Sequence, residues 1–196
     1  LEEVLPIFAG KAPLIVELKA ERGNADALAA AACKLLDKYH VTYCIESFDP
    51  RCLMWLWANH PDVVRGQLSE NFQRHGDAQD LPGAVRWVLS NLLLNARTRP
   101  DFIAYRFEDR KALSLRLCRG LYGAQEFSWT IRSKADMDAA EQDGALVIFR
   151  SKGVTTDESH HRLCPWQSAK GAAGHGDAPH HRQGEGEPVF HHPVRH

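Results

Sequence analysis

Residues 13–20 read PLIVELKA, and this stretch combines a strand-like apolar pattern with two charges. Successive side chains of a strand point to opposite faces, so Glu17 and Lys19 share one face with Ile15. An unpaired buried charge is costly, and such groups are therefore paired, neutralised or bound to a metal ion. Two interpretations stay open for this stretch alone: a salt bridge at the rim of a sheet, or a functional site at the end of a strand.

Strand and helix patterns alternate from this stretch to residue 150. Asn24 is a candidate N-cap for one helix, and Asp49 followed by Pro50 caps the next. Residues 1–8 resemble the end of an earlier helix. The patterns predict strands at 13–19, 41–47, 62–68, 101–106, 125–131 and 145–149, and helices at 24–39, from Pro50 onward, 83–97, 109–121 and 134–142.

The alternation indicates an α/β fold with a parallel sheet, because the strands are short and apolar on both faces. Two architectures fit this pattern: a doubly wound open sheet, and a (β/α)8 barrel whose first units are missing. No glycine-rich phosphate loop follows any strand, so the dinucleotide-binding fingerprint is absent. The amphipathicity of the helices does not separate the two architectures.

Composition limits the classes of partner. Hydrophobic residues make up 44% and charged residues 25% of 196 residues, with a formal net charge of −1. These values are typical of a globular domain and indicate neither nucleic acid nor an anionic membrane as the main partner. No apolar run approaches the roughly 20 residues of a membrane span. The five cysteines are odd in number and form no CxxC pair, which favours free thiols and, by default, a cytoplasmic location.

The character of the sequence changes after residue 150. Residues 151–196 hold eight of the eleven histidines and almost no apolar periodicity. Such a stretch buries too little surface to offset the loss of chain entropy. The sequence therefore predicts a folded domain over 1–150 and a disordered His/Gly-rich tail over 151–196. The histidine spacings match no structural zinc pattern, and no function is assigned to the tail.

Polar and aromatic side chains gather at the predicted carboxyl ends of the strands, where parallel barrels carry their reactive residues. Glu17 is a hard oxygen ligand suited to Mg²⁺ or Ca²⁺, and Lys19 can neutralise a phosphate oxygen. Trp129 can form an apolar wall for a small ligand, although a strand tryptophan is more often core. Further strand-end residues are Glu46, Ser47, Phe48, Gln67, Tyr105, Thr130, Phe149 and Arg150. Among these, Ser47 also suits a helix-capping role and Glu46 an outward, solvated position.

Several short stretches follow one another in a familiar order. They are LEEVL at 1–5, VELK at 16–19, SFDP at 47–50, RGQL at 65–68, PDFIAYRFED at 100–109 and WTIRS at 129–133. In this order and spacing, residues 1–149 resemble the later part of a glycerophosphodiester phosphodiesterase domain, with one stretch similar to a bacterial branch of that family. The resemblance implies a TIM (β/α)8 barrel, of which this chain holds about six of eight strand–helix units.

The resemblance also implies a chemistry. Enzymes of this family hydrolyse glycerophosphodiesters to sn-glycerol 3-phosphate and an alcohol in lipid metabolism, using a divalent cation. Glu17 matches a metal ligand of the family, for Mg²⁺ or Ca²⁺. Lys19 matches a cation beside the phosphate, and Trp129 matches an aromatic residue that lines the substrate pocket.

The chain also departs from the family pattern. The catalytic histidines of the family lie in His-Arg-Gly and His-Asp motifs that precede the LEEVL segment, and neither motif occurs here. His40, His60 and His75 do not replace them, so no catalytic residue is assigned. Two hypotheses result: the parent domain is a metal-dependent hydrolase, or this chain is a catalytically incompetent fragment without enzymatic activity of its own.

Overall fold

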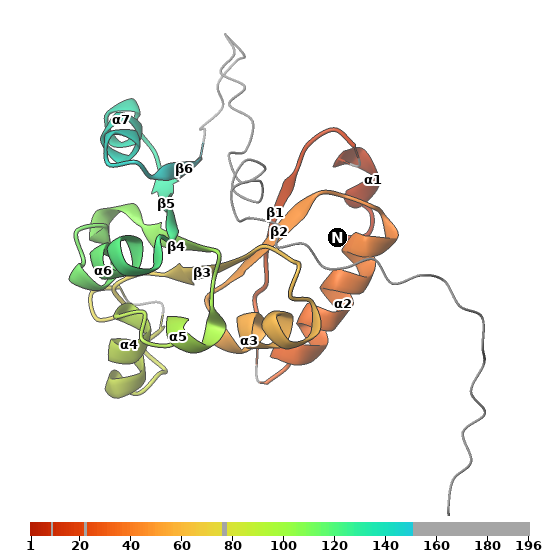
Figure 1. Ribbon diagram of the computed structural model, residues 1–196, viewed down its shortest axis with the longest axis horizontal. Helices are drawn as coiled ribbons and strands as arrows, with labels where there is room; N and C mark the ends of the chain where they lie inside the picture. The colour runs from red at the N-terminus through yellow and green to blue at the C-terminus, as the bar shows by residue number, and fades with distance from the viewer. Residues whose placement is uncertain (9, 22, 76–77, 151–196) are drawn as a thin grey trace, which may run out of the picture. The chain divides into compact units, whose positions relative to one another are not determined.

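A computed structural model describes residues 1–150 except 9, 22 and 76–77. The chain divides into two units, Leu1–Thr156 and Asp157–His196, and the predicted tail over 151–196 lies outside the described residues. In the first unit six strands form one sheet that curls into a half-barrel (Figure 1). These strands are β1 (Leu14–Glu17), β2 (Tyr43–Ser47), β3 (Arg65–Ser69), β4 (Phe102–Arg106), β5 (Gln125–Ile131) and β6 (Leu146–Phe149).

All neighbouring strands are parallel, and their order across the sheet equals their order in the sequence. A doubly wound sheet reverses direction at a switch point, whereas a barrel adds each strand on the same side. The order therefore confirms the predicted partial barrel and excludes the doubly wound alternative.

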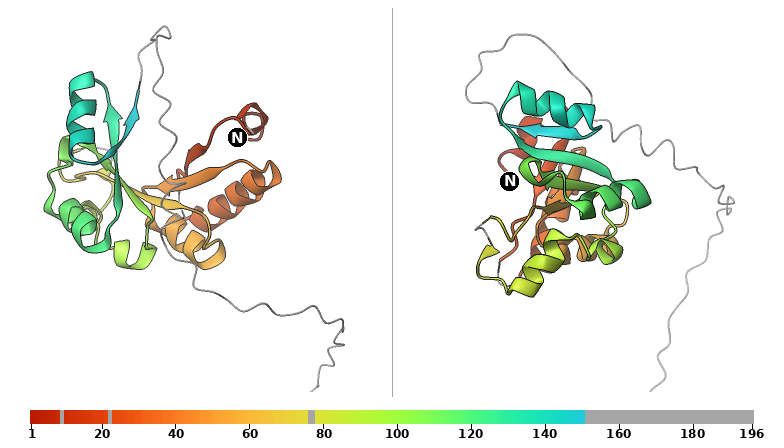
Figure 2. Two further views of the ribbon diagram at one scale, coloured as in Figure 1. Left: turned by 45° about the horizontal axis from the view of Figure 1, so that its top comes forward. Right: turned by 90° about the vertical axis from the view of Figure 1, so that its left-hand side faces the viewer.

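Helices connect the strands and lie on the outer face of the curled sheet (Figure 2). No helix among the described residues is long and apolar enough to cross a lipid bilayer. The helices are α1 (Leu5–Phe8), α2 (Ala25–Lys38), α3 (Pro50–Asn59), α4 (Gly83–Ser90), α5 (Asn95–Thr98), α6 (Leu113–Tyr122) and α7 (Lys134–Gln142), with a 3-10 turn, η2 (Phe107–Asp109), before α6.

Two helix predictions need correction. The predicted helix over 83–97 is interrupted between α4 and α5, where buried Leu92 takes a left-handed φ of 55°. Asn91 donates its side-chain amide to the Trp87 carbonyl, a local bond that competes with helix continuation. Asn24 holds the N-cap position of α2, but its side chain accepts a hydrogen bond from the Glu21 amide instead of capping the helix.

The start of α3 agrees with the prediction from the sequence, whereas the start of α6 does not. Asp49 caps α3 as expected, because its carboxylate accepts from the Arg51 amide while Pro50 opens the helix. The predicted helix over 109–121 begins later, at Leu113. Asp109, in the turn before it, accepts from the Asn71 amide and thereby joins η2 to the loop after β3.

The sheet has an apolar cluster on each face. On the outer face, Leu18 and Ile45 pack with the buried residues of α2 and α3. On the inner face, Cys44, Leu68 and Phe102 form a second cluster with partly buried neighbours such as Trp129. Both faces are therefore apolar, as expected for parallel strands of a barrel.

Gly66 permits close packing on the inner face. It is the register partner of Phe102, and a methyl group added at residue 66 would overlap the Phe102 ring. Gly66→Ala is expected to lower the free energy of unfolding by about 1–3 kcal/mol, since overpacking forces side chains or backbone to move. Urea unfolding monitored by circular dichroism measures this loss.

Gly83→Ala is the matched control, because nothing lies within 4 Å of a methyl group there. It should not destabilise the chain, since alanine is the better helix former. In a double-mutant cycle, Phe102→Leu should recover part of the loss of Gly66→Ala. Equal losses for both glycine variants would show that the contact with the Phe102 ring is not the cause.

Candidate functional site

The carboxyl ends of the strands surround a cavity of about 500 Å³ on the inner face of the half-barrel. The three site residues predicted from the sequence, Glu17, Lys19 and Trp129, all line it, although they come from strands at opposite sides of the sheet. The full lining is Glu17, Lys19, Glu46, Phe48, Leu68, Glu70, Phe72, Trp129, Thr130, Ile148 and Arg150. The cavity therefore combines carboxylates, cations and aromatic rings.

Two carboxylates lie side by side at the ends of β1 and β2. Glu17 and Glu46 are register partners in the parallel ladder, so their side chains project from the same face. Glu46 is 7% exposed, and its Oε2 atom has no hydrogen-bond partner. Burial, together with the nearby charge of Glu17, raises the pKa of Glu46 to about 7. The outward, solvated position considered for Glu46 is therefore wrong.

Lys19 forms a loose ion pair with Glu17. Its Nζ atom lies 3.7 Å from Glu17 Oε2, and its side chain is 78% exposed. An exposed pair at this distance contributes little to stability. The salt bridge and the cavity position are thus both present, and the ammonium group remains accessible to an anion in the cavity.

A second charged pair was missed by sequence reasoning. Arg106 Nη1 donates to Glu70 Oε2 at 2.8 Å, and the Glu70 side chain is only 2% exposed. Glu70 directly follows β3, which ends at Ser69, one residue later than predicted. Arg106 ends both β4 and the predicted strand over 101–106, so the choice of Tyr105 at this strand end was wrong by one position. Arg106 also lies 5.9 Å from the centroid of the Trp129 ring, which connects this pair to the aromatic wall.

Two predicted strand-end residues point to the outer face instead. Gln67 donates from Nε2 to the Ser47 and Leu68 carbonyls, and Tyr105 donates its hydroxyl to the Ser90 carbonyl. Because side chains alternate along a strand, the neighbouring residues Leu68 and Arg106, and not Gln67 and Tyr105, lie on the inner face. Gln67 and Tyr105 therefore do not belong to the cavity.

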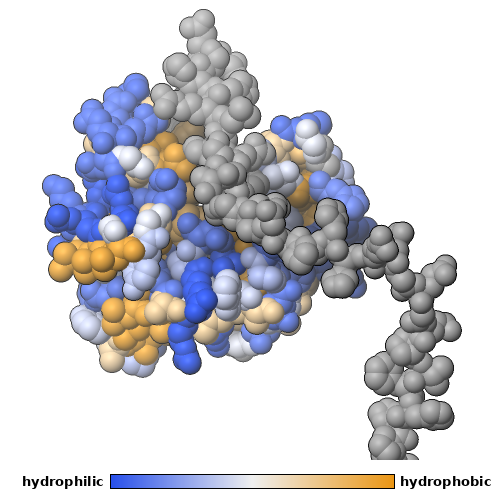
Figure 3. All heavy atoms as spheres, viewed as in Figure 1, coloured by the Kyte–Doolittle hydropathy of each residue, from blue (hydrophilic) through white to orange (hydrophobic). Residues whose placement is uncertain are grey.

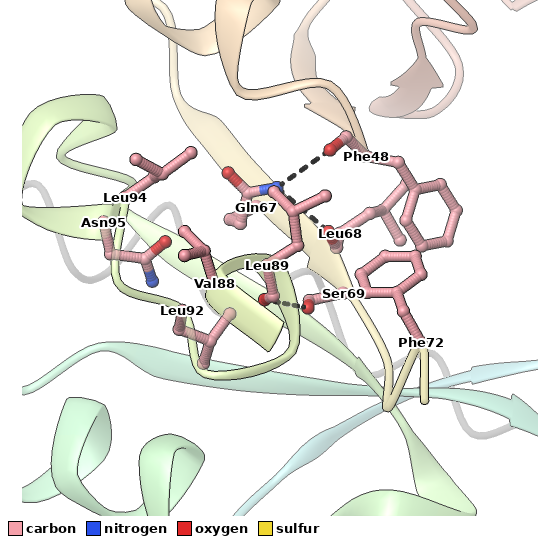
Figure 4. Close-up of a pocket in the computed structure, with 10 residues that line it drawn as sticks. All are labelled: Phe48, Gln67, Leu68, Ser69, Phe72, Val88, Leu89, Leu92, Leu94 and Asn95. Carbon is pink, nitrogen blue, oxygen red and sulfur yellow. Dashed lines mark hydrogen bonds between the residues drawn. The ribbon is translucent and has the colours of Figure 1, made fainter. Parts of the chain in front are cut away.

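Gln67 lies beside a second, much smaller hollow of about 10 Å³ beneath α4 (Figure 4). In this view the amide of Gln67 points to the Phe48 carbonyl, and the Ser69 hydroxyl bonds to the Leu89 carbonyl at 3.1 Å. The surroundings are mostly apolar, and the volume is close to that of a single water molecule. This hollow is part of the packing between β3 and α4.

Aromatic rings line the side of the cavity that extends from Phe48 to Trp129. The Phe48 ring packs edge-on against Phe72 at 6.0 Å and against Trp129 at 5.7 Å between centroids. Trp129 also belongs to the inner apolar cluster. It is thus both a core residue and a cavity wall, which unites its two sequence-based interpretations.

Ser47 has a structural role at the end of β2. Its Oγ atom donates to the Leu18 carbonyl at 2.6 Å and accepts from the Asp49 amide at 3.1 Å. One hydroxyl therefore links the end of β1 to the start of α3. This combines the helix-start role considered for Ser47 with a tie that holds the strands carrying Glu17 and Glu46 together.

None of the three described histidines lines the cavity. His75 is held by Asp109, with 2.8 Å between Nε2 and Oδ2, while His40 and His60 follow the ends of α2 and α3. Within the described ranges, no three His, Cys, Asp or Glu side chains gather as ligands for a metal ion.

Comparison with known proteins gives a likeness of fold. No family model and no curated protein matches the sequence. A phosphodiesterase from Oleispira antarctica, solved in complex with its product sn-glycerol-3-phosphate, is similar with a TM-score of 0.58 and 17% identity, over 76% of this chain and 56% of its own. A glycerophosphodiester phosphodiesterase from Parabacteroides distasonis is similar with a TM-score of 0.57 and 15% identity, over 76% of this chain and 58% of its own.

The chain thus has the fold of the family that its sequence resembles. It spans little more than half the length of these similar structures. At such low identity the comparison establishes the fold alone.

Glu46 makes stability depend on pH. The pKa of Glu46 is about 7 in the folded chain, above its ordinary value of 4.5. The negatively charged form of Glu46 is therefore less favourable in the folded chain than in the unfolded chain. The free energy of unfolding should therefore fall as the pH rises from about 4.5 to 7, by an amount on the order of 3 kcal/mol. Urea unfolding at pH 5 and pH 8, with EDTA present, should show this decrease for the native chain and a much smaller one for Glu46→Gln.

Glu3→Gln, at an exposed glutamate, is the control and should keep the native pH dependence. If Glu46→Gln keeps the full decrease, another group is responsible for it.

Proposed function

We propose that the cavity binds the glycerol phosphate part of a glycerophosphodiester, and that this chain derives from a divalent-cation-dependent phosphodiester hydrolase. The observation that carries the proposal is the Glu17–Glu46 carboxylate pair beside Lys19, which faces Trp129 across one cavity. The family resemblance of the sequence supports the same substrate class. The likeness of fold adds support, since one similar structure is described with sn-glycerol-3-phosphate.

The residues present fit a divalent cation. Two adjacent carboxylates, one with a buried oxygen that lacks a hydrogen bond, form a negative site whose repulsion a cation would relieve. Mg²⁺ commonly takes one or two protein carboxylates and completes its shell with water and substrate phosphate. We propose Glu17 and Glu46 as these ligands. The bound cation would neutralise charge on the phosphate group and polarise its oxygens.

The other cavity residues suit the substrate. The exposed ammonium of Lys19 can donate to phosphate oxygens, and its flexible stem allows it to leave Glu17 without a large cost. The Trp129 face offers an apolar surface for the carbon atoms of the glycerol group. Arg106 keeps the Glu70 carboxylate compensated, so that this third acid does not repel the phosphate.

Binding without turnover is the second candidate function for this chain by itself. Hydrolysis needs a proton donor and acceptor within hydrogen-bond reach of the reacting oxygens. No described histidine lines the cavity, and the family motifs that hold the catalytic histidines do not occur in the sequence. Under this second candidate function, the chain would bind the metal ion and the substrate but would lack the groups that donate and accept protons during hydrolysis.

Calorimetric titration of the full chain with sn-glycerol 3-phosphate tests binding. Heat of binding is expected with Mg²⁺ or Ca²⁺ present and not with EDTA. Lys19→Ala should weaken the affinity about 10- to 100-fold, since a hydrogen bond to a charged group contributes about 1.5–3 kcal/mol. Lys11→Ala, outside the cavity, should leave it unchanged. Equal affinities of the two variants would overturn the phosphate role of Lys19.

The Glu17→Gln variant distinguishes a role of Glu17 as a cation ligand from a general effect of its negative charge. It removes one negative charge near the phosphate, so simple repulsion predicts tighter binding, whereas a cation ligand predicts loss of the Mg²⁺ dependence. The same samples, incubated with a glycerophosphodiester and followed by ³¹P NMR, distinguish hydrolysis from binding alone. Absence of binding by the native chain under every condition would contradict the proposal.

A further inference from the structure

A second surface, on the outside of the half-barrel, exposes many large apolar side chains. It is formed by α4, α6 and the segment between α4 and α5, on the opposite face of the sheet from the cavity. Figure 3 shows hydrophobic residues gathered over α4 and α6. This α4–α6 surface comprises Trp87, Leu93, Leu113, Leu117, Leu121 and Tyr122. Such a concentration on one surface is a mark of an interaction site.

The helix α6 is apolar on two sides. Leu115 and Cys118 pack into the core beneath the helix. Leu113, Leu117 and Leu121, spaced by four residues, form a separate stripe and are 67%, 48% and 72% exposed. The core contacts therefore do not explain this stripe, which no part of the described chain covers.

Two joined hollows lie beside the leucine stripe. Their volumes are about 330 and 390 Å³, and they share Asn95, Ala96, Cys118 and Tyr122. No acidic residue lines either hollow, and Arg99 is the one charged residue among the lining. The surface is thus apolar with a cationic margin.

The surrounding charges are strongly asymmetric. Residues 83–123 hold eight Lys and Arg residues and three acids, although the whole chain is almost neutral. Three of the eight cations, Arg106, Arg110 and Arg119, pair with acids outside this range, which leaves five. Each of the three acids within the range already contacts a cation or a histidine. Arg97 and Arg116 are exposed and have no ion-pair partner among the described residues. The net charge of the whole chain, which gave no indication of an anionic membrane as partner, conceals this local excess.

We propose that the α4–α6 surface binds the surface of an anionic lipid bilayer. Exposed leucines can enter the acyl boundary, while Trp87 and Tyr122 suit the headgroup region and the arginines attract anionic lipid. A second copy of this chain fits less well, because a two-fold interface would place Arg97 and Arg116 against the same cationic margin. A fluid bilayer can cover the leucine stripe and fill the two hollows, because lipid chains adapt to the protein surface and need no complementary shape.

Vesicle co-sedimentation of the full chain tests the proposal. The chain should bind phosphatidylcholine vesicles that contain phosphatidylserine, and bind weakly to phosphatidylcholine alone, with a loss of binding at high salt. Arg97→Gln with Arg116→Gln should lower the partition onto anionic vesicles roughly 25-fold, from about fivefold for each cation removed. Leu113→Gln, Leu117→Gln and Leu121→Gln together should lower it at least about tenfold.

Ile7→Gln with Phe149→Gln is the matched control, since both side chains are large, exposed and outside this surface. Circular dichroism verifies that each variant folds. Binding that is equal on neutral and anionic vesicles, or that the control reduces as much as the leucine variant, would overturn the proposal. So would a lack of binding to anionic vesicles. Self-association that light scattering detects and the leucine variant abolishes would then assign the surface to a second copy of the chain.

Discussion

The parallel register between β1 and β2 is the constraint on which the cavity depends. The Leu18 amide donates to the Glu46 carbonyl, and the Ser47 hydroxyl donates to the Leu18 carbonyl. These two bonds fix the strand ends against each other and bring Glu17 beside Glu46. A one-residue shift in the pairing of β1 with β2 would turn one of the two carboxylates to the outer face and separate it from the other. Glu17 of the VELK stretch therefore becomes part of a carboxylate pair only because β2, which carries Glu46, is the neighbouring strand.

The two faces of the sheet differ in what packs against them. On the inner face, close packing of Phe102 over Gly66 supports the aromatic wall that ends at Trp129. On the outer face, helices cover most of the apolar surface, but α6 presents a second leucine stripe to solvent. The charged groups follow this division. The carboxylates gather at the strand ends, whereas Arg97 and Arg116 near the outer stripe have no ion-pair partner among the described residues.

The sequence predicted local features well where the local chemistry decides them. The bounds of β5 and α7 are those expected, and Asp49 with Pro50 starts α3. Tertiary packing decided the rest. The helix over 83–97 is interrupted at Leu92, where burial of this side chain adds to the local bond between Asn91 and Trp87. The pairing of Glu46 with Glu17, and of Glu70 with Arg106, depends on exact strand ends and on which strands are neighbours.

A divalent cation held jointly by Glu17 and Glu46 is the proposal on which the function of the cavity depends. Anomalous diffraction from crystals of the full chain soaked in Mn²⁺, which takes the oxygen ligands that suit Mg²⁺, tests it directly. A cation bound by both residues gives an anomalous peak between the two carboxylates, about 2 Å from an oxygen of each. Absence of a peak at this position, with Mn²⁺ bound elsewhere or not at all, would show that the two carboxylates do not form a cation site.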